Sequence, residues 1–424
     1  MLFGAPRSAA VPQVAMDPNV RWLALGAVVR AGGLSLIAPY FVLYLRNVLH
    51  LGYAEVGLLA IVVGAPALAV VSFAGLLVDR VGRRRVIRDA LLAEALTILG
   101  TAAAMGDRSL LGVVLFVVLV GVSGSIAGPA ISAYTADLAE GSERTRAFTW
   151  ERIGWNVGFS VGVLAGGSLI GLFGFPNVGF AAGATLLAST TLLVVVLEPS
   201  AYDLARAAGV PRAGGGAPSL SASLRLVAKD RIFLAFCGAV AIAGLSVGQW
   251  SPIFPLYVNT VLGVPYALLG VGLALNGVLV VVAQAPTTRL AIGHRHTSVL
   301  ALGILLYVAG FLLLAVVALV PAILLGGFFA SVFVLTMGEN VMSIPTTTLP
   351  SNLAPAAEIG AYNGAFYAIA GLGQALSAPL GGAVLAVTSN PVETWTVLMV
   401  PAVPALLLLH LYVRPRIRRS ADRA

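Results

Sequence analysis

Long apolar runs alternate with short breaks rich in charge, Gly and Pro along the whole chain. Runs such as 110–122 and 300–320 are continuous, whereas a transmembrane barrel alternates apolar and polar residues. A helix needs about 20 apolar residues to cross a hydrocarbon core of about 30 Å. The pattern therefore predicts an all-α membrane protein with twelve spans, near residues 21–46, 53–76, 86–106, 109–136, 147–173, 177–197, 231–258, 265–289, 297–319, 321–348, 359–388 and 394–413.

The predicted spans fall into two groups of six, separated by a polar segment. Residues 198–230 hold Arg206, Arg212, Arg225 and Lys229 beside three glycines at 214–216, a composition typical of a linker. We therefore predict a cytoplasmic tail at 1–20, a six-helix bundle at 21–197, a cytoplasmic linker at 198–230, a second bundle at 231–413 and a basic cytoplasmic tail at 414–424.

The two groups repeat each other in sequence. Pro-Tyr-Phe-Val-Leu-Tyr at 39–44 matches Pro-Ile-Phe-Pro-Leu-Tyr at 252–257. A Leu-Gly pair at 51–52 precedes the loop at 82–85, and a second pair at 262–263 precedes the loop at 293–296 with the same spacing. This order indicates a parallel duplication, with a pseudo-two-fold axis along the membrane normal and a substrate site between the halves.

Composition and charge agree with a membrane protein. Hydrophobic residues make up 59% of the 424 residues and charged residues 10%, against about 25% charged in soluble domains. The net charge of +8 reflects the Lys and Arg bias of cytoplasmic loops rather than nucleic-acid binding. With both termini in the cytoplasm, 22 of the 25 basic residues fall on that side; Arg46 and Arg108 fall outside and Arg30 within a span.

Cysteine content and the N-terminal residues bear on disulfides, metal sites and the role of the first span. Cys237 is the one cysteine and lies in an apolar run, so an intrachain disulfide is excluded and neither a metal site nor a cofactor is expected. Residues 1–20 lack the basic start and apolar core of a signal peptide. We expect the first span to remain as an anchor in the cell membrane, and the chain to act as a monomer.

The loop between the second and third spans carries the most specific motif, Gly-Leu-Leu-Val-Asp-Arg-Val-Gly-Arg-Arg-Arg at 75–85. It resembles the signature loop of the major facilitator superfamily, and the resemblance extends over residues 21–413. It implies a twelve-helix fold of two pseudo-symmetric bundles and a secondary transporter. In that family the loop holds the halves together on the cytoplasmic side and governs the switch between inward- and outward-open states. The gating residues implied here are Gly75, Asp79, Arg80, Gly82, Arg83 and Arg84.

The chemistry of this loop supports such a role. Asp79 at a membrane edge is costly unless an arginine or a helix N-terminus compensates its charge. The alternative is a basic loop that only sets topology, which would need neither Asp79 nor the glycines. In the second half Leu290 stands where Asp79 would align, so we expect the second latch to be weak or absent.

Two further stretches resemble helices of proton-linked exporters in this superfamily. The fifth span is glycine-rich like that of drug and metabolite exporters, although Val163 replaces the proline of their motif; the alternative role is close helix packing. Gly338-Glu339-Asn340 and the segment 360–364 are similar to the tenth and eleventh helices of those exporters. The glycines concerned, with their span-eleven counterparts, are Gly158, Gly162, Gly166, Gly167, Gly373, Gly381 and Gly382.

Three ionisable residues fall inside apolar spans, where charge is costly unless paired or hydrated. The family arrangement places Arg30 and Glu339 on cavity-lining helices of opposite halves, and Glu94 on a peripheral helix. A carboxyl group in a low-dielectric cavity can carry a proton, so we predict that Glu339 carries it and that Arg30 tunes Glu339 or meets the substrate. The alternatives are structural: Glu339 as a hydrogen-bond partner of span eleven, and Arg30 as a clamp on backbone carbonyls. For Glu94 we expect a structural role.

Polar and aromatic residues near the predicted cavity suit a small amphipathic substrate. They are Tyr40, Tyr44, Gln249, Trp250, Tyr257, Asn276 and Asn340. The resulting hypothesis is a secondary active transporter working by alternating access, most simply proton-coupled efflux; the alternative is a proton-coupled importer. An intramembrane enzyme is disfavoured because the four histidines lie near span ends, and a channel because no sequence resembles a selectivity filter.

Overall fold

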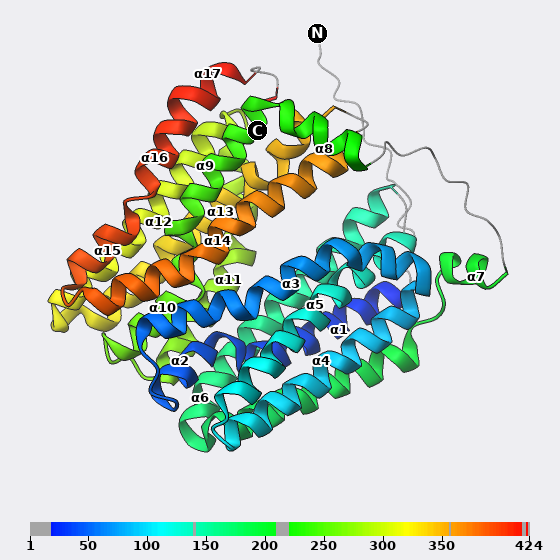
Figure 1. Ribbon diagram of the computed structural model, residues 1–424, viewed down its shortest axis with the longest axis horizontal. Helices are drawn as coiled ribbons and strands as arrows, with labels where there is room; N and C mark the ends of the chain where they lie inside the picture. The colour runs from blue at the N-terminus through cyan, green and yellow to red at the C-terminus, as the bar shows by residue number, and fades with distance from the viewer. Residues whose placement is uncertain (1–17, 139–140, 209–219, 356–357, 418–420, 423–424) are drawn as a thin grey trace, which may run out of the picture.

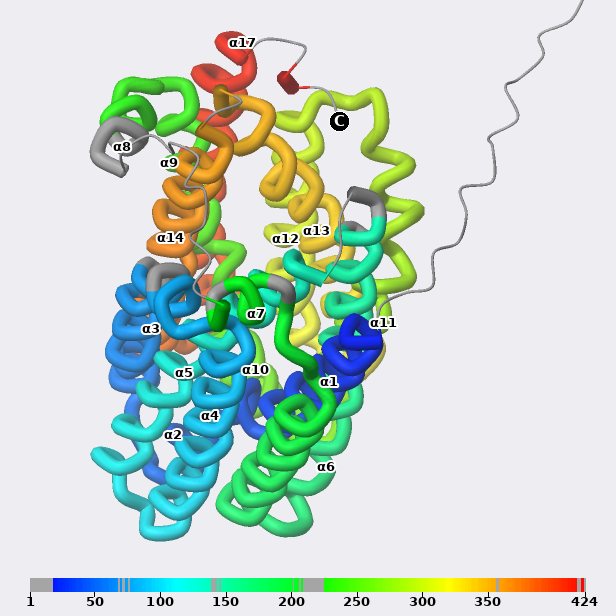
Figure 2. The backbone as a smooth tube through the Cα atoms, turned by 90° about the vertical axis from the view of Figure 1, so that its right-hand side faces the viewer, coloured from blue at the N-terminus to red at the C-terminus, as the bar shows by residue number. Residues whose placement is uncertain are grey.

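The computed structural model describes residues 18–138, 141–208, 220–355, 358–417 and 421–422. Within these ranges the chain is helical and forms no β-strand. Figures 1 and 2 show two groups of helices, with α1–α6 below and α9 and α12–α17 above, while α10 reaches down beside α2. The predicted all-α architecture of two pseudo-symmetric bundles is confirmed.

The first half consists of α1 (Pro18–Ser35), the 3-10 turn η1 (Ala38–Tyr40), α2 (Phe41–Asn47), α3 (Tyr53–Val81), α4 (Arg83–Gly106), α5 (Leu110–Leu138) and α6 (Gly141–Val196). Two short helices follow, α7 (Ala201–Ala207) and α8 (Leu220–Lys229). They lie within the segment predicted as a linker, whose glycines at 214–216 fall outside the described residues.

The second half consists of α9 (Arg231–Val247), η2 (Gly248–Trp250), α10 (Ile253–Thr260), α11 (Tyr266–Ala291), α12 (His296–Leu319), η3 (Pro321–Ile323), α13 (Leu324–Leu353), α14 (Ile359–Val387), α15 (Pro391–Met399), α16 (Ala402–Leu407), the π-helical turn η4 (Leu408–Val413) and α17 (Arg414–Arg416).

Nine of the described helical segments are long and apolar enough to cross a membrane. One of them, Arg146–Val196, makes two passages because the backbone leaves helical geometry at Gly174, where φ is 77°. The helices α3 and α4 supply the remaining two of the twelve spans; α4 is less apolar because it begins with three arginines. Pro39 and Pro252, which occupy equivalent positions in the repeat, coincide with the breaks in the first and seventh spans.

The two halves meet tightly at one end of the molecule, which we call the sealed end. There Asn47 Nδ2 donates to Asn259 Oδ1 (2.9 Å) and to the Tyr266 hydroxyl (2.8 Å). The Tyr53 hydroxyl donates to Thr260 Oγ1 (3.1 Å). These bonds join α2 and α3 to α10 and α11; a further one, from Arg152 Nη2 of α6 to Gln284 Oε1 of α11 (3.5 Å), lies nearer the opposite end.

The halves diverge away from the sealed end. A Cβ added at Gly57 of α3 would lie 3.0 Å from the Cα of Pro379 in α14. Two turns further along, a Cβ at Gly64 or at Gly371 would meet no described atom within 4 Å. Along α3 and α14 the structure is therefore closed at the sealed end and opens toward the opposite end, which carries Asp79, Asp203 and Arg295 and which we call the charged end. The helices α6 and α11 stay in contact, since a Cβ at Gly277 of α11 would collide with Ser160 of α6.

Candidate functional site

A buried ion pair joins two helices of the first half. Arg30 of α1 donates through Nε to Glu94 Oε2 (2.7 Å) and through Nη2 to Glu94 Oε1 (2.8 Å). The side chains are 10% and 2% exposed. A Cβ added at Gly124 of α5 would lie 3.0 Å from Glu94 Oε1, so the absence of a side chain there leaves room for the carboxylate. Bidentate geometry of this kind gives a strong, directional pair.

This pair bears on two of the sequence predictions. We expected Arg30 to tune Glu339 or to meet the substrate; the structure instead pairs its guanidinium with Glu94 of the same half. We expected a structural role for Glu94 on a peripheral helix, and its side chain points from that helix into the first half, where it holds Arg30. Arg30 is not a clamp on backbone carbonyls either: its partners are the Glu94 carboxylate and the face of Trp155, whose ring centre lies 5.5 Å away.

A second acid in this region was missed by sequence reasoning. Glu151 of α6 accepts a hydrogen bond from Thr135 Oγ1 (3.3 Å) and interacts electrostatically with Arg30. It lies beside Arg152 near the start of the predicted fifth span and was not singled out as a buried charge. The helical spacing of Glu151, Trp155 and Gly158 places them on one face of the helix, and this pattern could have marked Glu151 as a residue that faces the bundle.

The second half contains a pocket of about 480 Å³ that includes Glu339. Asn276 Nδ2 donates to Glu339 Oε2 (2.9 Å) and to Thr336 Oγ1 (3.0 Å). Among the described residues no cation forms an ion pair with Glu339; the charged group that acts on it electrostatically is Arg152 of the first half. The pocket is lined by residues of α9, η2, α12, α13 and α14, among them Trp250, Tyr307, Met342, Ser343, Thr346, Phe366 and Gln374.

Glu339 therefore differs from Glu94 in how its charge is compensated. Glu94 has a guanidinium in direct contact, whereas Glu339 has one amide donor and faces a cavity. A carboxyl group in such surroundings is accommodated more easily when neutral than when charged. The two buried carboxyl groups thus differ in their partners: Glu94 is ion-paired, and Glu339 is hydrogen-bonded to an amide at the wall of a cavity.

The other predicted cavity residues divide into two sets. Trp250 lines the pocket and Asn276 holds Glu339. The remaining five side chains are buried in the helix bundle. Four of them donate hydrogen bonds to backbone carbonyls: Tyr40 to Val163 (2.6 Å), Tyr44 to Met105 (3.0 Å), Gln249 to Ser377 (2.9 Å) and Asn340 to Leu279 (3.4 Å). The fifth, Tyr257, packs edge-on against Trp395. These five side chains do not line the described pocket.

The loop at the charged end is organised around Arg83. Its guanidinium donates to Asp79 (2.7 Å) and to Asp137 of α5 (2.8 Å), and it lies 3.8 Å from the ring centre of Tyr202. Gly82 has φ of 105°, a conformation that side chains rarely adopt. These partners of Arg83 belong to the first half or to α7. Gly75 falls outside the described side chains.

An aspartate from α7 caps the helix that follows this loop. Asp203 accepts hydrogen bonds from the backbone N–H of Arg83 (2.8 Å) and of Arg84 (3.3 Å) at the start of α4. A carboxylate at a helix N-terminus satisfies free N–H groups and favours the helix dipole. Asp203 and Asp137 were not singled out from the sequence.

The second half carries an equivalent cap. Asp422 is fully buried and accepts from the backbone N–H and the hydroxyl of Thr297 (both 2.9 Å) at the start of α12. It also accepts from Arg295 Nε. We expected the second latch to be weak or absent because Leu290 replaces Asp79. A carboxylate reaches this loop from the C-terminal segment and caps α12 within the second half, and the weak second latch stays a prediction.

The predicted glycines bring helices into backbone contact. A Cβ added at Gly158 or Gly162 of α6 would lie closer than 3.0 Å to backbone atoms of α1, and one at Gly166 equally close to the backbone of Leu36, just after α1. One at Gly373 would collide in the same way with Ala241 of α9. Within each double glycine the first residue faces its own half and the second faces the other: Gly167 meets Tyr266 of α11, and Gly382 meets Tyr53 of α3.

These features define a class of membrane protein: a transporter of two repeated six-helix bundles, with a cavity in the second bundle that contains a buried carboxyl group. The model of the Major Facilitator Superfamily matches residues 23–378 and 251–424. The chain belongs to this superfamily and is a membrane transporter.

Relatives and solved structures agree with this assignment. The chain is 24% identical over 379 residues to the uncharacterized MFS-type transporter YttB of Bacillus subtilis (strain 168), covering 87% of this chain and 89% of the relative. It is 31% identical over 172 residues to Multidrug resistance protein 2 of the same organism, covering 40% of this chain and 41% of the relative.

The fold is shared with structures of distant transporters. A bacterial homolog of the human lysosomal transporter Spinster, in an inward-facing and occupied conformation, aligns with a TM-score of 0.72 at 15% identity over 96% of this chain and 97% of that one. The peptide transporter POT in complex with sulfate aligns with a TM-score of 0.73 at 16% identity, covering 96% of each chain.

Proposed function

We propose that the protein is a secondary active transporter that exports a small amphipathic molecule in exchange for protons, by alternating access. Closure at the sealed end and divergence toward the charged end are the geometry of one end-open state. The partial similarity to Multidrug resistance protein 2 supports an amphipathic substrate. In the membrane, both termini and the charged end face the cytoplasm, because most basic residues lie on that side.

Glu339 is the proton-carrying residue in this proposal. One observation supports this role most directly: the Glu339 carboxyl group has no ion-pair partner among the described residues and lies at the wall of a cavity of about 480 Å³. Trp250 and Phe366 give the same cavity an aromatic surface. Arg152 of α6 approaches Glu339 from the other half, so relative motion of the halves changes the charge that Glu339 experiences.

The test uses proteoliposomes that contain a pH-sensitive dye, with the membrane potential clamped. Ethidium, an aromatic cation, is added outside vesicles whose lumen is acidic. Antiport exchanges entering ethidium for departing protons and raises the luminal pH, whereas symport lowers it, whichever way the protein is inserted. We expect the luminal pH to rise with the parent protein, and Glu339→Gln to abolish the rise while it retains ethidium binding and ethidium exchange.

Glu393→Gln is the matched control, because Glu393 is exposed near the start of α15 and lies outside the pocket. Glu94→Gln does not serve as a control, since it would leave Arg30 buried without its partner. A luminal pH that falls on addition of ethidium would establish the importer instead. Full coupling in Glu339→Gln would remove Glu339 from the mechanism.

A further inference from the structure

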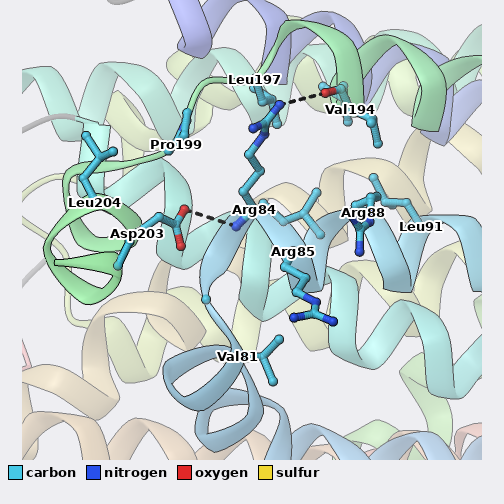
Figure 3. Close-up of a pocket in the computed structure, with 14 residues that line it drawn as sticks. Val81, Arg84, Arg85, Arg88, Leu91, Val194, Leu197, Pro199, Asp203 and Leu204 are labelled. Atoms are coloured by element: carbon cyan, nitrogen blue, oxygen red, sulfur yellow. Dashed lines mark hydrogen bonds between the residues drawn. The ribbon is translucent and has the colours of Figure 1, made fainter. Parts of the chain in front are cut away.

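A pocket of about 580 Å³ lies at the charged end of the first half, away from the transport cavity. It is formed by the start of α4, the end of α6 and the short helix α7 (Figure 3). Three arginines of one helical turn, Arg84, Arg85 and Arg88, line one side. Leu91, Leu193 and Leu197 supply an apolar wall.

The arginines retain capacity to bind an anion. Arg84 Nη2 donates to the Val194 carbonyl (3.1 Å), as Figure 3 shows, which leaves the other N–H groups of this guanidinium for a ligand. Arg85 and Arg88 share the carboxylate of Asp89, at 3.9 Å and 2.7 Å, and are 71% and 48% exposed. Exposed pairs of this kind are weak and exchange readily. The other nearby carboxylate, Asp203, is occupied by backbone N–H groups of α4.

The pocket continues into a lipid-facing surface. Arg88, Leu92 and Leu96 recur every four residues and therefore share one face of α4. Leu92 and Leu96 are 41% and 54% exposed, which in a membrane-spanning helix means contact with acyl chains. Leu92 lies about 6 Å of helix below Arg88. A molecule with an anionic head and an apolar tail can thus occupy the arginines and the leucine stripe together.

We propose that this pocket binds the headgroup phosphate of an anionic phospholipid, with an acyl chain along Leu92 and Leu96. Basic pockets at the cytoplasmic edge of membrane helices favour such headgroups. A soluble phosphate ester would use the arginines but would leave the adjoining leucines unused, and the lipid therefore fits more of the observed surface.

The test measures lipid binding to the purified full-length protein in detergent by native mass spectrometry. Phosphatidylglycerol is compared with phosphatidylcholine of the same acyl chains. We expect preferential retention of phosphatidylglycerol. Each arginine near an anionic surface contributes about fivefold; because Asp89 already neutralises part of the charge, Arg85→Gln/Arg88→Gln should weaken phosphatidylglycerol binding about tenfold.

The matched control is Arg144→Gln/Arg146→Gln, which removes two exposed arginines from the start of α6 at the same end of the same half. It should retain the parent affinity, and unfolding midpoints should be equal for both double variants. The proposal is overturned by equal retention of both lipids, by unchanged binding in Arg85→Gln/Arg88→Gln, or by displacement of the lipid with excess glycerol phosphate, which would identify a site for soluble phosphates.

Discussion

Gly382 offers a direct test of how the sealed end controls the conformation. A Cβ added at Gly382 of α14 would lie within 3.2 Å of Tyr53 O and of the N and Cα atoms of Gly57. All three are backbone atoms of α3 in the other half, so side-chain rotation cannot relieve the overlap. Overpacking by one methyl group costs about 1–3 kcal/mol. Gly382→Ala should therefore destabilise the sealed state relative to states in which α3 and α14 separate at this end.

The size of the shift can be estimated from this cost. About 2 kcal/mol corresponds to a factor of about 30 in an equilibrium constant. If the ratio of sealed to unsealed molecules is 99:1 in the parent, it would fall to about 3:1 in the variant. A measured distance distribution readily detects an unsealed population of that size. Helix propensity does not oppose the shift, because alanine favours the helix over glycine in both conformations.

The assay is pulsed electron resonance between spin labels on the two halves. One labelled pair, Leu172→Cys with Val387→Cys, reports on the sealed end, and Arg144→Cys with Thr347→Cys reports on the charged end; all four positions are exposed. The native Cys237 is fully buried and should remain unlabelled. In Gly382→Ala the first pair should gain a longer distance and the second pair a shorter one.

Two alanine variants of neighbouring glycines serve as controls. A Cβ at Gly381 would meet Gln249 and Ile253 of its own half, and one at Gly371 would meet no described atom within 4 Å. Gly381→Ala should lower the unfolding midpoint without changing either distance, and Gly371→Ala should change neither. Distances in folded Gly382→Ala that match the parent would refute the idea that this backbone contact holds the end closed.

Two further predictions concern the first half and the orientation. Arg30→Gln and Glu94→Gln should each lower the free energy of unfolding by about 3–5 kcal/mol, because one buried charge loses its partner. In thermal unfolding the double variant should recover part of that loss. Single variants as stable as the parent would contradict the pair. Ala208→Cys, at an exposed position after α7, should resist an impermeant maleimide added to intact cells, and labelling from outside would reverse the proposed topology.

The fold was predictable because hydropathy alone decides which segments enter a bilayer. The twelve apolar runs and the repeat motif around Pro39 and Pro252 correspond to elements of the structure. The breaks inside spans were harder to place. The turn at Gly174 depends on a positive φ, and the π-helical turn at 408–413 depends on packing in the last span.

The partner of Arg30 could not be found by assigning whole helices to the cavity or the periphery. The helix α4 has one buried face, on which Leu91, Glu94 and Ile98 follow each other at helical spacing, while Leu92 and Leu96 face outward. That spacing was visible in the sequence, but the rotation that turns this face toward α1 is set by tertiary packing. Asp422 gave no signal of its own, since it follows a basic tail and no pattern links it to Thr297.

The caps on α4 and α12 have a consequence for the energetics of switching. Asp203 and Asp422 each bind a loop of the half that precedes them in the chain. Each of these described capping contacts at the charged end therefore stays within one half and does not cross the boundary between the two halves. When the halves rock, these contacts travel with them and contribute nothing to the barrier. The hydrogen bonds that join the two halves include those of Asn47 and Tyr53 at the sealed end and the one from Arg152 of α6 to Gln284 of α11, each worth about 0.5–1.5 kcal/mol. The rate of turnover is thus adjustable from a few polar residues at the boundary between the halves, while the capped helix ends can be stabilised without slowing the cycle.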